Sequence, residues 1–255
     1  MTEMTHARLV TDQFGPQAAA YVASSVHAQG EDLDALEAVV AGQSSAHLLD
    51  LGCGGGHVSF RAAPHVAQVT AYDLSAQMLG AMAKAAVERG LANVVTRQGT
   101  VERLPFEDGS FDFICSRYSA HHWQGFATAL GEARRVLKAG GRAVFMDSVS
   151  PGPALLDSYL QAIELLRDSS HVRDYSISEW IRSMTSAGFL LEKVERRRVR
   201  LEFASWIARM RTPEVRVQAI RSLQKDAPSE VMKHFAIELD GSFMLDTMSL
   251  EAVAA

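Results

Sequence analysis

The stretch HLLDLGCGGGHVSF, residues 47–60, decides the fold of this chain. Its apolar start predicts a buried strand, its glycines predict a tight turn, and the spacing from His57 onward predicts the beginning of a helix. We attribute the missing side chains at the turn to a ligand that presses against the backbone, where amide groups and the helix N-terminus favour an anionic group. The stretch therefore predicts a strand, a binding turn and a helix in that order.

The order of the glycines narrows the choice of ligand. A dinucleotide fingerprint reads G-x-G-x-x-G, and Gly52 and Gly54 satisfy its first two positions, but His57 stands at the sixth. The run instead reads Asp50-x-Gly52-x-Gly54-x-Gly56, with an acid before the glycines. This pattern suits a cofactor whose charged groups are an amine and a carboxylate and which has no pyrophosphate.

An acidic residue, Asp73, directly follows the second predicted strand, which covers residues 68–72. A carboxylate at that edge of a parallel sheet can accept hydrogen bonds from the hydroxyls of a ribose, as the acid of a dinucleotide site does. The alternative is that Asp73 only helps Ser75 to cap the following helix. Because the glycine turn and the acid occur together in this order, we favour the ribose contact.

Strands and helices alternate from residue 46 to residue 147. Strands are predicted over 46–50, 68–72, 93–97, 111–116 and 142–146, followed by two more over 190–203 and 241–253. Helices are predicted over 31–40, from Ser75 to Gly90, and from Phe126 to the glycines at 140–141. In the helix after Ser75, the residues expected to face inward are Met78, Leu79, Met82, Ala86 and Val87. The pattern predicts an α/β fold with a doubly wound, mostly parallel sheet of seven strands, whose carboxyl edge holds the ligand.

The remaining segments complete a prediction of four parts. Residues 1–45 form a helical arm that closes over the cofactor and includes a helix over 18–26, and residues 46–203 form the core. Residues 204–240 form a helical lid insertion with two helical pieces over 205–236, and residues 241–255 supply the last strand. The arginines between residues 196 and 200 are interpreted as a solvated face.

The bulk composition excludes several classes of protein. A chain of 255 residues with 47% hydrophobic and 22% charged residues is that of an ordinary globular protein. The net charge of −5 argues against a nucleic-acid partner, which needs a basic face. We expect no membrane partner and a cytoplasmic location, because the sequence shows no signal segment and no apolar span. Cys53 and Cys115 form no C-x-x-C pair, and no metal site is expected.

Five motifs together resemble class I AdoMet-dependent methyltransferases of the type 11 group, similar to ubiquinone/menaquinone-biosynthesis C-methyltransferases. They are Asp50 to Gly56, Asp73-Leu74-Ser75-x-x-Met78-Leu79, Glu102-x-Leu104-Pro105-Phe106, Phe111-Asp112 and Arg135-Val136-Leu137-Lys138-x-Gly140-Gly141. The resemblance covers about residues 40 to 150 and implies the Rossmann-like methyltransferase fold. It implies S-adenosyl-L-methionine as cofactor and methyl transfer to a small-molecule acceptor by in-line displacement, with a carbon, nitrogen or oxygen acceptor left open.

The resemblance also implies which residues contact the cofactor. They are Tyr21, Asp50, Gly52, Gly54, Gly56, Asp73, Leu74, Met78, Thr100, Val101, Glu102 and Ser116. Thr100 stands where an acid is common in the family, and its hydroxyl is a weaker partner for the adenine amine than a carboxylate.

The acceptor is expected beyond the fourth strand and along the arm and lid. The predicted acceptor contacts are Phe14, Tyr118, His121, Trp123 and Arg209. His121 is a candidate general base. The alternative is that His121 and His122 open the next helix and hydrogen-bond locally. Methyl transfer needs no base when the acceptor is already nucleophilic, so the sequence leaves both open, as it does the oligomeric state.

Two other functions remain open at this point. A nicotinamide-dependent oxidoreductase is disfavoured by His57 in the fingerprint, and a non-catalytic AdoMet-binding protein is disfavoured by the aromatic residues on the acceptor side. The negative net charge argues against RNA as the methyl acceptor.

Overall fold

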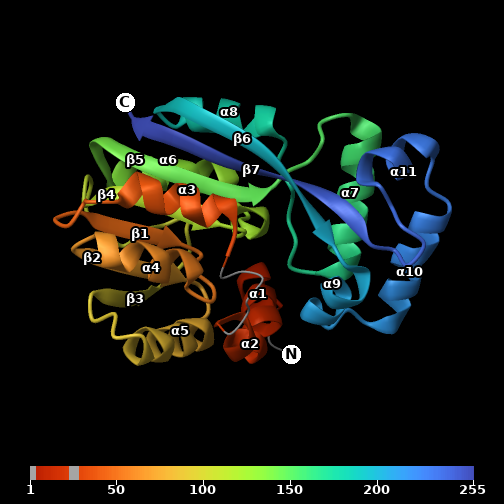
Figure 1. The fold of residues 1–255 in the computed structure, drawn as a ribbon, viewed down its shortest axis with the longest axis horizontal. Helices are drawn as coiled ribbons and strands as arrows, with labels where there is room; N and C mark the ends of the chain where they lie inside the picture. The colour runs from red at the N-terminus through yellow and green to blue at the C-terminus, as the bar shows by residue number, and fades with distance from the viewer. Residues whose placement is uncertain (1–3, 23–28) are drawn as a thin grey trace.

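A sheet of seven strands in the order β3-β2-β1-β4-β5-β7-β6 forms the centre of the molecule (Figure 1). The structure is a computed structural model that describes residues 4–22 and 29–255. The strands are β1 His47–Leu51, β2 Gln68–Asp73, β3 Val94–Gln98, β4 Phe111–Arg117, β5 Leu137–Ser148, β6 Phe189–Leu201 and β7 Phe243–Ala254. β1 to β5 pair in parallel, and β7 runs antiparallel between β5 and β6. The predicted mostly parallel, seven-stranded sheet is confirmed.

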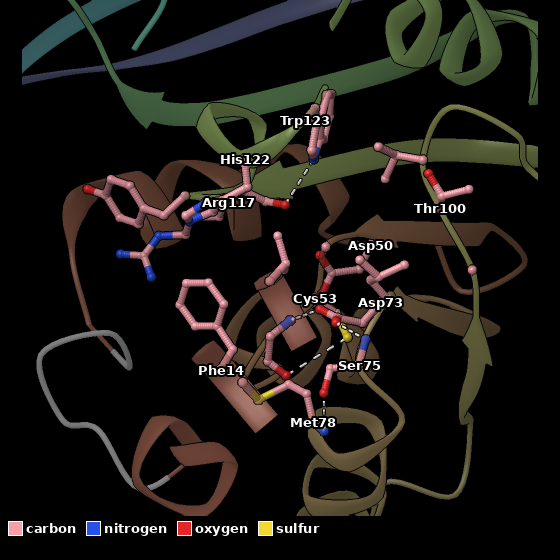
Figure 2. A pocket seen from close by; sticks show the side chains of 18 of the residues that line it. Phe14, Asp50, Cys53, Asp73, Ser75, Met78, Thr100, Arg117, His122 and Trp123 are labelled. Carbon is pink, nitrogen blue, oxygen red and sulfur yellow. Dashed lines mark hydrogen bonds between the residues drawn. The ribbon is translucent and has the colours of Figure 1, made fainter. Parts of the chain in front are cut away.

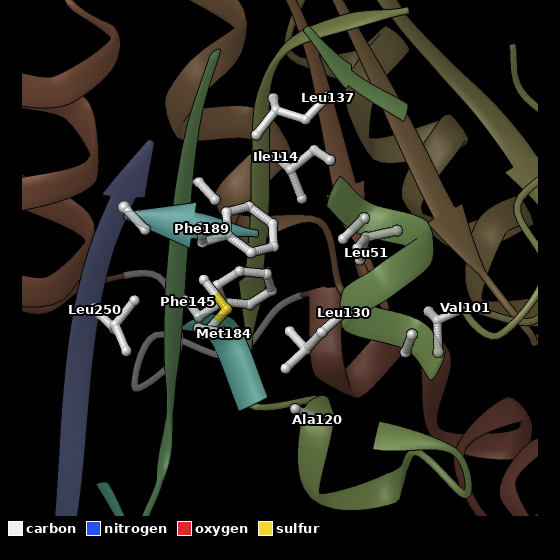
Figure 3. Packing of buried hydrophobic residues seen from close by; sticks show 14 of the residues in the cluster. Leu51, Val101, Ile114, Ala120, Leu130, Leu137, Phe145, Met184, Phe189 and Leu250 are labelled. Atoms are coloured by element: carbon white, nitrogen blue, oxygen red, sulfur yellow. The ribbon is translucent and has the colours of Figure 1, made fainter. Parts of the chain in front are cut away.

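Alternating side chains of the inner strands bury both faces of this sheet. Leu48 and Val144 belong to a cluster with helices α3 (Glu31–Val40) and α4 (His57–Ala62), which lie in front of the sheet in Figure 1. Leu49 and Phe145 belong to the opposite cluster with α6 (Phe126–Val136) and α8 (Ile177–Ser186), shown in Figure 3. Neighbouring residues of a strand point to opposite faces, so each inner strand anchors helices on both sides. The strand order reverses beside β1, and such a switch point opens a crevice at the carboxyl edge.

Two boundaries differ from the sequence prediction. Helix α5 (Ala76–Glu88) begins at the predicted cap, Ser75, whose hydroxyl accepts from the amide of Met78, but Val87 is 80% exposed and does not face inward. The buried stripe runs through residues 78, 79, 82, 85 and 86, and one further residue turns the side chain by about 100° away from it. Helix α6 ends at Val136, and β5 begins at once with Leu137, so residues 138–141 extend the strand.

The segment between β6 and β7 contains three helices instead of the two predicted pieces. They are α9 (Phe203–Met210), α10 (Glu214–Lys225) and α11 (Ser229–Phe235). Pro213 and Pro228 stand at the N-caps of α10 and α11, where proline interrupts a helical run that otherwise has continuous spacing. With α7 (Ala154–Arg167) these helices enclose their own apolar cluster around Trp206, beyond one end of β6 and β7 (Figure 1). We call α9, α10 and α11 the helical insertion.

The N-terminal arm lies between α5 and the helical insertion (Figure 1). It consists of α1 (His6–Phe14), a 3-10 turn (Gly15–Gln17) and α2 (Ala18–Val22). The predicted helix over 18–26 is confirmed up to Val22, and its last residues fall outside the described part of the chain. The side-chain amide of Gln13 donates to the Met210 carbonyl of the helical insertion (2.8 Å), so the arm contacts the elements on both of its sides. No helix within the described residues is both long and apolar enough to cross a membrane.

Candidate functional site

A cavity of about 190 Å³ opens at the carboxyl ends of β1, β2 and β4 (Figure 2). We call it the strand-end cavity. Most of the residues predicted for the cofactor and the acceptor line it: Phe14, Tyr21, Asp50, Gly52, Gly54, Asp73, Leu74, Met78, Thr100, Val101, Glu102, Tyr118 and Trp123. The sequence motifs therefore converge on one hollow at the switch point of the sheet.

Most of the glycines in the turn are needed for packing inside the protein. A β-carbon would overlap a neighbouring atom at Gly52 (against Ser119), at Gly55 (against the backbone of Tyr21) and at Gly56 (against Met82). The expectation that a ligand explains all the missing side chains is therefore wrong. Gly56 also lies outside the cavity lining, facing α5.

Gly54 is the exception among these glycines. It has a φ of +49°, which favours glycine, and a β-carbon there would meet nothing within 4 Å. Its amide donates to Oδ2 of Asp73 (2.9 Å), while Oδ1 of Asp73 accepts from the amide of Ser75 (2.8 Å). One carboxylate thus joins the glycine turn to the start of α5. Each of its oxygens keeps a lone pair, so helix capping and a ligand contact are compatible.

The other acid of the motif, Asp50, is a structural tie. Its Oδ2 accepts from both the amide (3.1 Å) and the hydroxyl (2.6 Å) of Ser59 in α4. Burial raises the pKa of Asp50 to about 7, although the hydrogen bonds from Ser59 oppose that rise. Burial also raises the pKa of Asp73, against hydrogen bonds from the backbone of residues 54, 74 and 75. Further hydrogen-bond donors would therefore stabilise the charged form of both acids, and Asp73 has lone pairs left to accept them.

The loop after β3 borders the cavity with a fixed backbone. The Tyr72 hydroxyl donates to the carbonyl of Thr100 (3.1 Å), and the Thr100 hydroxyl donates to Glu102. Glu102 in turn accepts from the amide of Gly125 (3.3 Å). Because its proton is used by Glu102, the Thr100 hydroxyl offers the cavity an acceptor oxygen, which suits an exocyclic amine.

Besides Gly56, three predicted site residues lie elsewhere. The hydroxyl of Ser116 donates to the Leu51 carbonyl (2.8 Å) and is buried between β4 and β1, outside the cavity lining. His121 and Arg209 line a second, larger cavity of about 770 Å³. This second cavity lies against the helical insertion, with Trp206 and Leu245 among its apolar walls, and we call it the insertion cavity.

The two cavities share part of their lining. Phe14, Tyr21, Arg117, Tyr118 and His122 line both. The Phe14 ring packs edge-on against Tyr21 (5.7 Å between centroids) and His122 (5.0 Å), so the arm contributes to the partition. Tyr118 adopts a φ of +51°, a strained value for an aromatic residue that is characteristic of functional sites.

Adjacent histidines have opposite charge preferences at this partition. His121 lies in a 3-10 turn that follows β4, and its Nδ1 is 2.6 Å from Oδ1 of Asp147 in β5. Burial opposes the charged ring, but the attraction and hydrogen bond of Asp147 outweigh it and raise the pKa of His121 to about 9. Burial and the neighbouring His121 charge lower the pKa of His122 to about 3. At neutral pH His121 is therefore protonated and His122 neutral.

Several lining residues were missed by the sequence reasoning. His57, which breaks the dinucleotide fingerprint, lies with Nε2 2.9 Å from the Tyr21 carbonyl and so connects the turn to the arm. Arg117 pairs with Asp32 of α3 (2.5 Å), and Ser119 accepts from the Trp123 indole (3.1 Å). Position at the end of β4 was a usable signal for residues 117 and 119, whereas the distant partner of Arg117 leaves no mark in the sequence. Among the described residues, no group of three or more His, Cys, Asp or Glu could hold a metal ion.

The chain matches a methyltransferase family model and is similar to several bacterial proteins. A family model described as a methyltransferase domain matches residues 49–145. The chain is 48% identical to YafE of Escherichia coli K12 over 77% of this chain and 95% of that protein. It is 34% identical to the ubiquinone/menaquinone biosynthesis C-methyltransferase UbiE of Zymomonas mobilis, over 43% of this chain and 45% of that protein.

The similarity to YcgJ of Bacillus subtilis extends over nearly the whole chain. YcgJ carries the name of a methyltransferase and is 33% identical over 94% of this chain and 95% of that protein. Its crystal structure superposes with a TM-score of 0.85, covering 88% of this chain and 98% of that one. The matching family model, the superposed fold and the identity along most of the length place the chain in one group: it belongs to the class I methyltransferases.

Proposed function

We propose that this protein transfers a methyl group from S-adenosyl-L-methionine to a small-molecule acceptor by in-line displacement. The single observation that carries the choice of donor is the joint between Gly54 and Asp73 at the strand-end cavity. There a left-handed glycine without a neighbouring side chain lies next to a partly buried carboxylate with lone pairs to spare.

The lining fits the parts of this donor. Asp73 would accept from the ribose hydroxyls, and Gly52 and Gly54 would lie along the methionine part. Leu74, Met78 and Val101 would pack against the nucleoside, with the Thr100 oxygen facing the adenine amine. When bound, the donor supplies an electrophilic methyl group on a sulfonium, and the protein must mainly hold the acceptor in line with it.

The parts of the chain take corresponding roles in this proposal. Residues 1–45 act as an arm that closes over the donor, with Phe14 and Tyr21 covering it. Residues 46–203 form the donor-binding core, residues 204–240 act as a lid over the acceptor, and residues 241–255 complete the sheet. Tyr118 and Trp123 would contact the acceptor where the cavities meet, and Arg209 would contact it from the lid. Cavities of this size, each partly open, suit a small acceptor better than a nucleic acid or a membrane.

Neither alternative function gains support from the site. A nicotinamide dinucleotide needs a glycine where His57 holds the arm. A sensor without turnover has no need for a second cavity that shares its wall with the first.

Calorimetric titration with S-adenosylhomocysteine tests the proposal. We expect binding by the native protein and a loss of at least about 100-fold in affinity for Asp73→Ala, since a partly buried hydrogen-bonded acceptor is removed. Glu88→Gln, which changes an exposed acid at the far end of α5, is the matched control and should bind normally. Incubation of the protein with methyl-labelled donor and a metabolite extract would then identify labelled products. The proposal would be overturned if the protein bound neither S-adenosyl-L-methionine nor S-adenosylhomocysteine.

A further inference from the structure

The partition between the cavities is where a methyl group would pass from donor to acceptor. His122 lines both cavities, and its ring centroid lies 4.2 Å from that of His121, which lines only the insertion cavity. His121 therefore stands one ring away from the partition, on the acceptor side. A group on the acceptor close to the reacting atom would lie within reach of this ring.

The surroundings of His121 hold a proton on it. Asp147 is buried and already accepts from the amides of Ala120 (2.8 Å) and Ser148 (2.8 Å), which favours its charged, accepting form. The Nδ1 of His121 therefore donates to Asp147. Among the described residues, Nε2 has no hydrogen-bond partner, although 18% of the side chain is exposed. With both nitrogens protonated, Nε2–H is a donor available to the insertion cavity.

The other groups that face His121 leave this donor charged. From α7 comes Glu164, whose carboxylate is paired with Arg167 (3.0 Å). From the segment after α7 comes Asp174, which is bonded to the Ser148 hydroxyl, and the ring of His171 lies 6.0 Å away between centroids. The neighbouring His122 is neutral at physiological pH. The acids around the ring thus stabilise its charge without occupying Nε2.

The rest of the insertion cavity is apolar in part and carries side chains of both charges. Trp206, Leu245 and Met248 line it, and so do the guanidinium groups of Arg167 and Arg209. Acidic side chains line the cavity too, among them Glu164, which pairs with Arg167 (3.0 Å), so the choice of an anionic acceptor rests on the donor of His121.

We infer that Nε2 of His121 donates a hydrogen bond to an acidic oxygen of the methyl acceptor, so that the insertion cavity takes the acceptor as a phenolate or an enolate and not as an amine. This rests on the proposed methyl transfer. The oxygen of the phenolate, or the carbon of the enolate, provides the electron pair for the new bond to the methyl carbon. The carbon–sulfur bond breaks with its electron pair left on sulfur, so the negative acceptor and the positive sulfonium both become neutral. His121 keeps its proton throughout and acts as a donor in place of the predicted base.

Binding of 4-nitrophenol to the protein saturated with S-adenosylhomocysteine tests the inference without turnover. The phenolate absorbs visible light and the phenol does not, so absorbance across a pH series reports the ionisation of the bound probe. We expect the apparent pKa of bound 4-nitrophenol to fall by about one unit relative to the free compound. His121→Gln removes the charge at similar size and should abolish this shift. Asp147→Asn should reduce it by lowering the proton affinity of His121.

The chain offers a matched control in a second histidine–aspartate pair. His234 lies 3.0 Å from Asp246 and lines neither cavity, so His234→Gln should leave the shift unchanged. Absence of probe binding, a bound probe without a shift, or a shift that persists in His121→Gln would overturn the inference. The titration with S-adenosylhomocysteine keeps the two proposals apart. Normal binding of S-adenosylhomocysteine together with any of those results leaves methyl transfer standing, whereas its absence removes both.

Discussion

The strand-end cavity and the insertion cavity are built in different ways. The first is lined largely by short runs that directly follow β1, β2, β3 and β4, so chain order and space agree. The second is lined by the arm, by α7, by the consecutive elements β6 and α9, and by β7, which are four segments far apart in the sequence that come together only in the fold. The difference teaches that a donor site can be encoded in local motifs, while an acceptor site can be assembled from tertiary contacts.

The largest expected effect concerns the apolar cluster behind the insertion cavity. Trp206 is fully buried there, and its ring lies under Arg167, 5.0 Å from the guanidinium carbon. Trp206→Ala should lower the free energy of unfolding by about 3–5 kcal/mol, as for other large aromatic truncations. Affinity for S-adenosylhomocysteine should stay within a few-fold if the two cavities are independently built. Chemical denaturation and calorimetry measure the two quantities, and a parallel collapse of both would break the comparison.

A second effect comes from the charged His121 on the acceptor side. Its pKa is raised from 6.5 to about 9, so the stabilisation is complete below about pH 6.5 and is lost as the pH rises through about 9. The difference in unfolding free energy between the native protein and His121→Gln should therefore shrink by roughly 3 kcal/mol from pH 6 to pH 10. Denaturation at each pH gives this difference. A constant difference over that range would contradict a raised pKa.

A substitution in the glycine turn should, in contrast to Trp206→Ala, act mainly on the affinity for the donor. Gly52→Ala places a β-carbon against Ser119 at a φ of +66°, which strains the turn of the strand-end cavity. We expect a loss of about 100-fold in affinity for S-adenosylhomocysteine, or about 2.7 kcal/mol. Gly80→Ala is the matched control, since a β-carbon at that position in α5 meets nothing within 4 Å and alanine favours helices. Equal effects of both substitutions would show that the strain argument fails.

The smallest expected effect concerns the arm. Phe14→Ala removes two edge-on ring contacts from the partition and should weaken S-adenosylhomocysteine binding by about tenfold, with little change in overall stability. Calorimetry and thermal melting check this, with the fully exposed Leu239→Ala as the neutral control. Unchanged affinity in Phe14→Ala would remove the arm from the donor site.

The sequence predicted structure well wherever a segment is determined by its own residues and by uniform burial. The inner strands β1, β2, β4 and β7 were located to within two residues because they are covered on both faces and rich in apolar residues, as in β4. β5 is the exception, since it begins at Leu137 and not at residue 142. The helix over 31–40 and the cap at Ser75 follow from local spacing and local hydrogen bonds. Asp73 could be singled out because its position after a strand already fixes where its carboxylate lies.

Tertiary contacts account for what could not be predicted. The glycines were assigned to a ligand, but Ser119 and Met82, which require two of them, are distant in the sequence. The insertion divides into three helices because of prolines whose effect the periodicity concealed. Likewise nothing near His121 announces Asp147, so its proton affinity is visible only after β4 and β5 are paired.

The hydrogen bond between His57 and the Tyr21 carbonyl has a kinetic consequence. It fastens the arm to the donor turn, while Gln13 fastens the same arm to Met210 on the acceptor side. Because the same element borders both cavities, we expect its displacement to couple the exchange rates of donor and acceptor, which steady-state measurements would reveal.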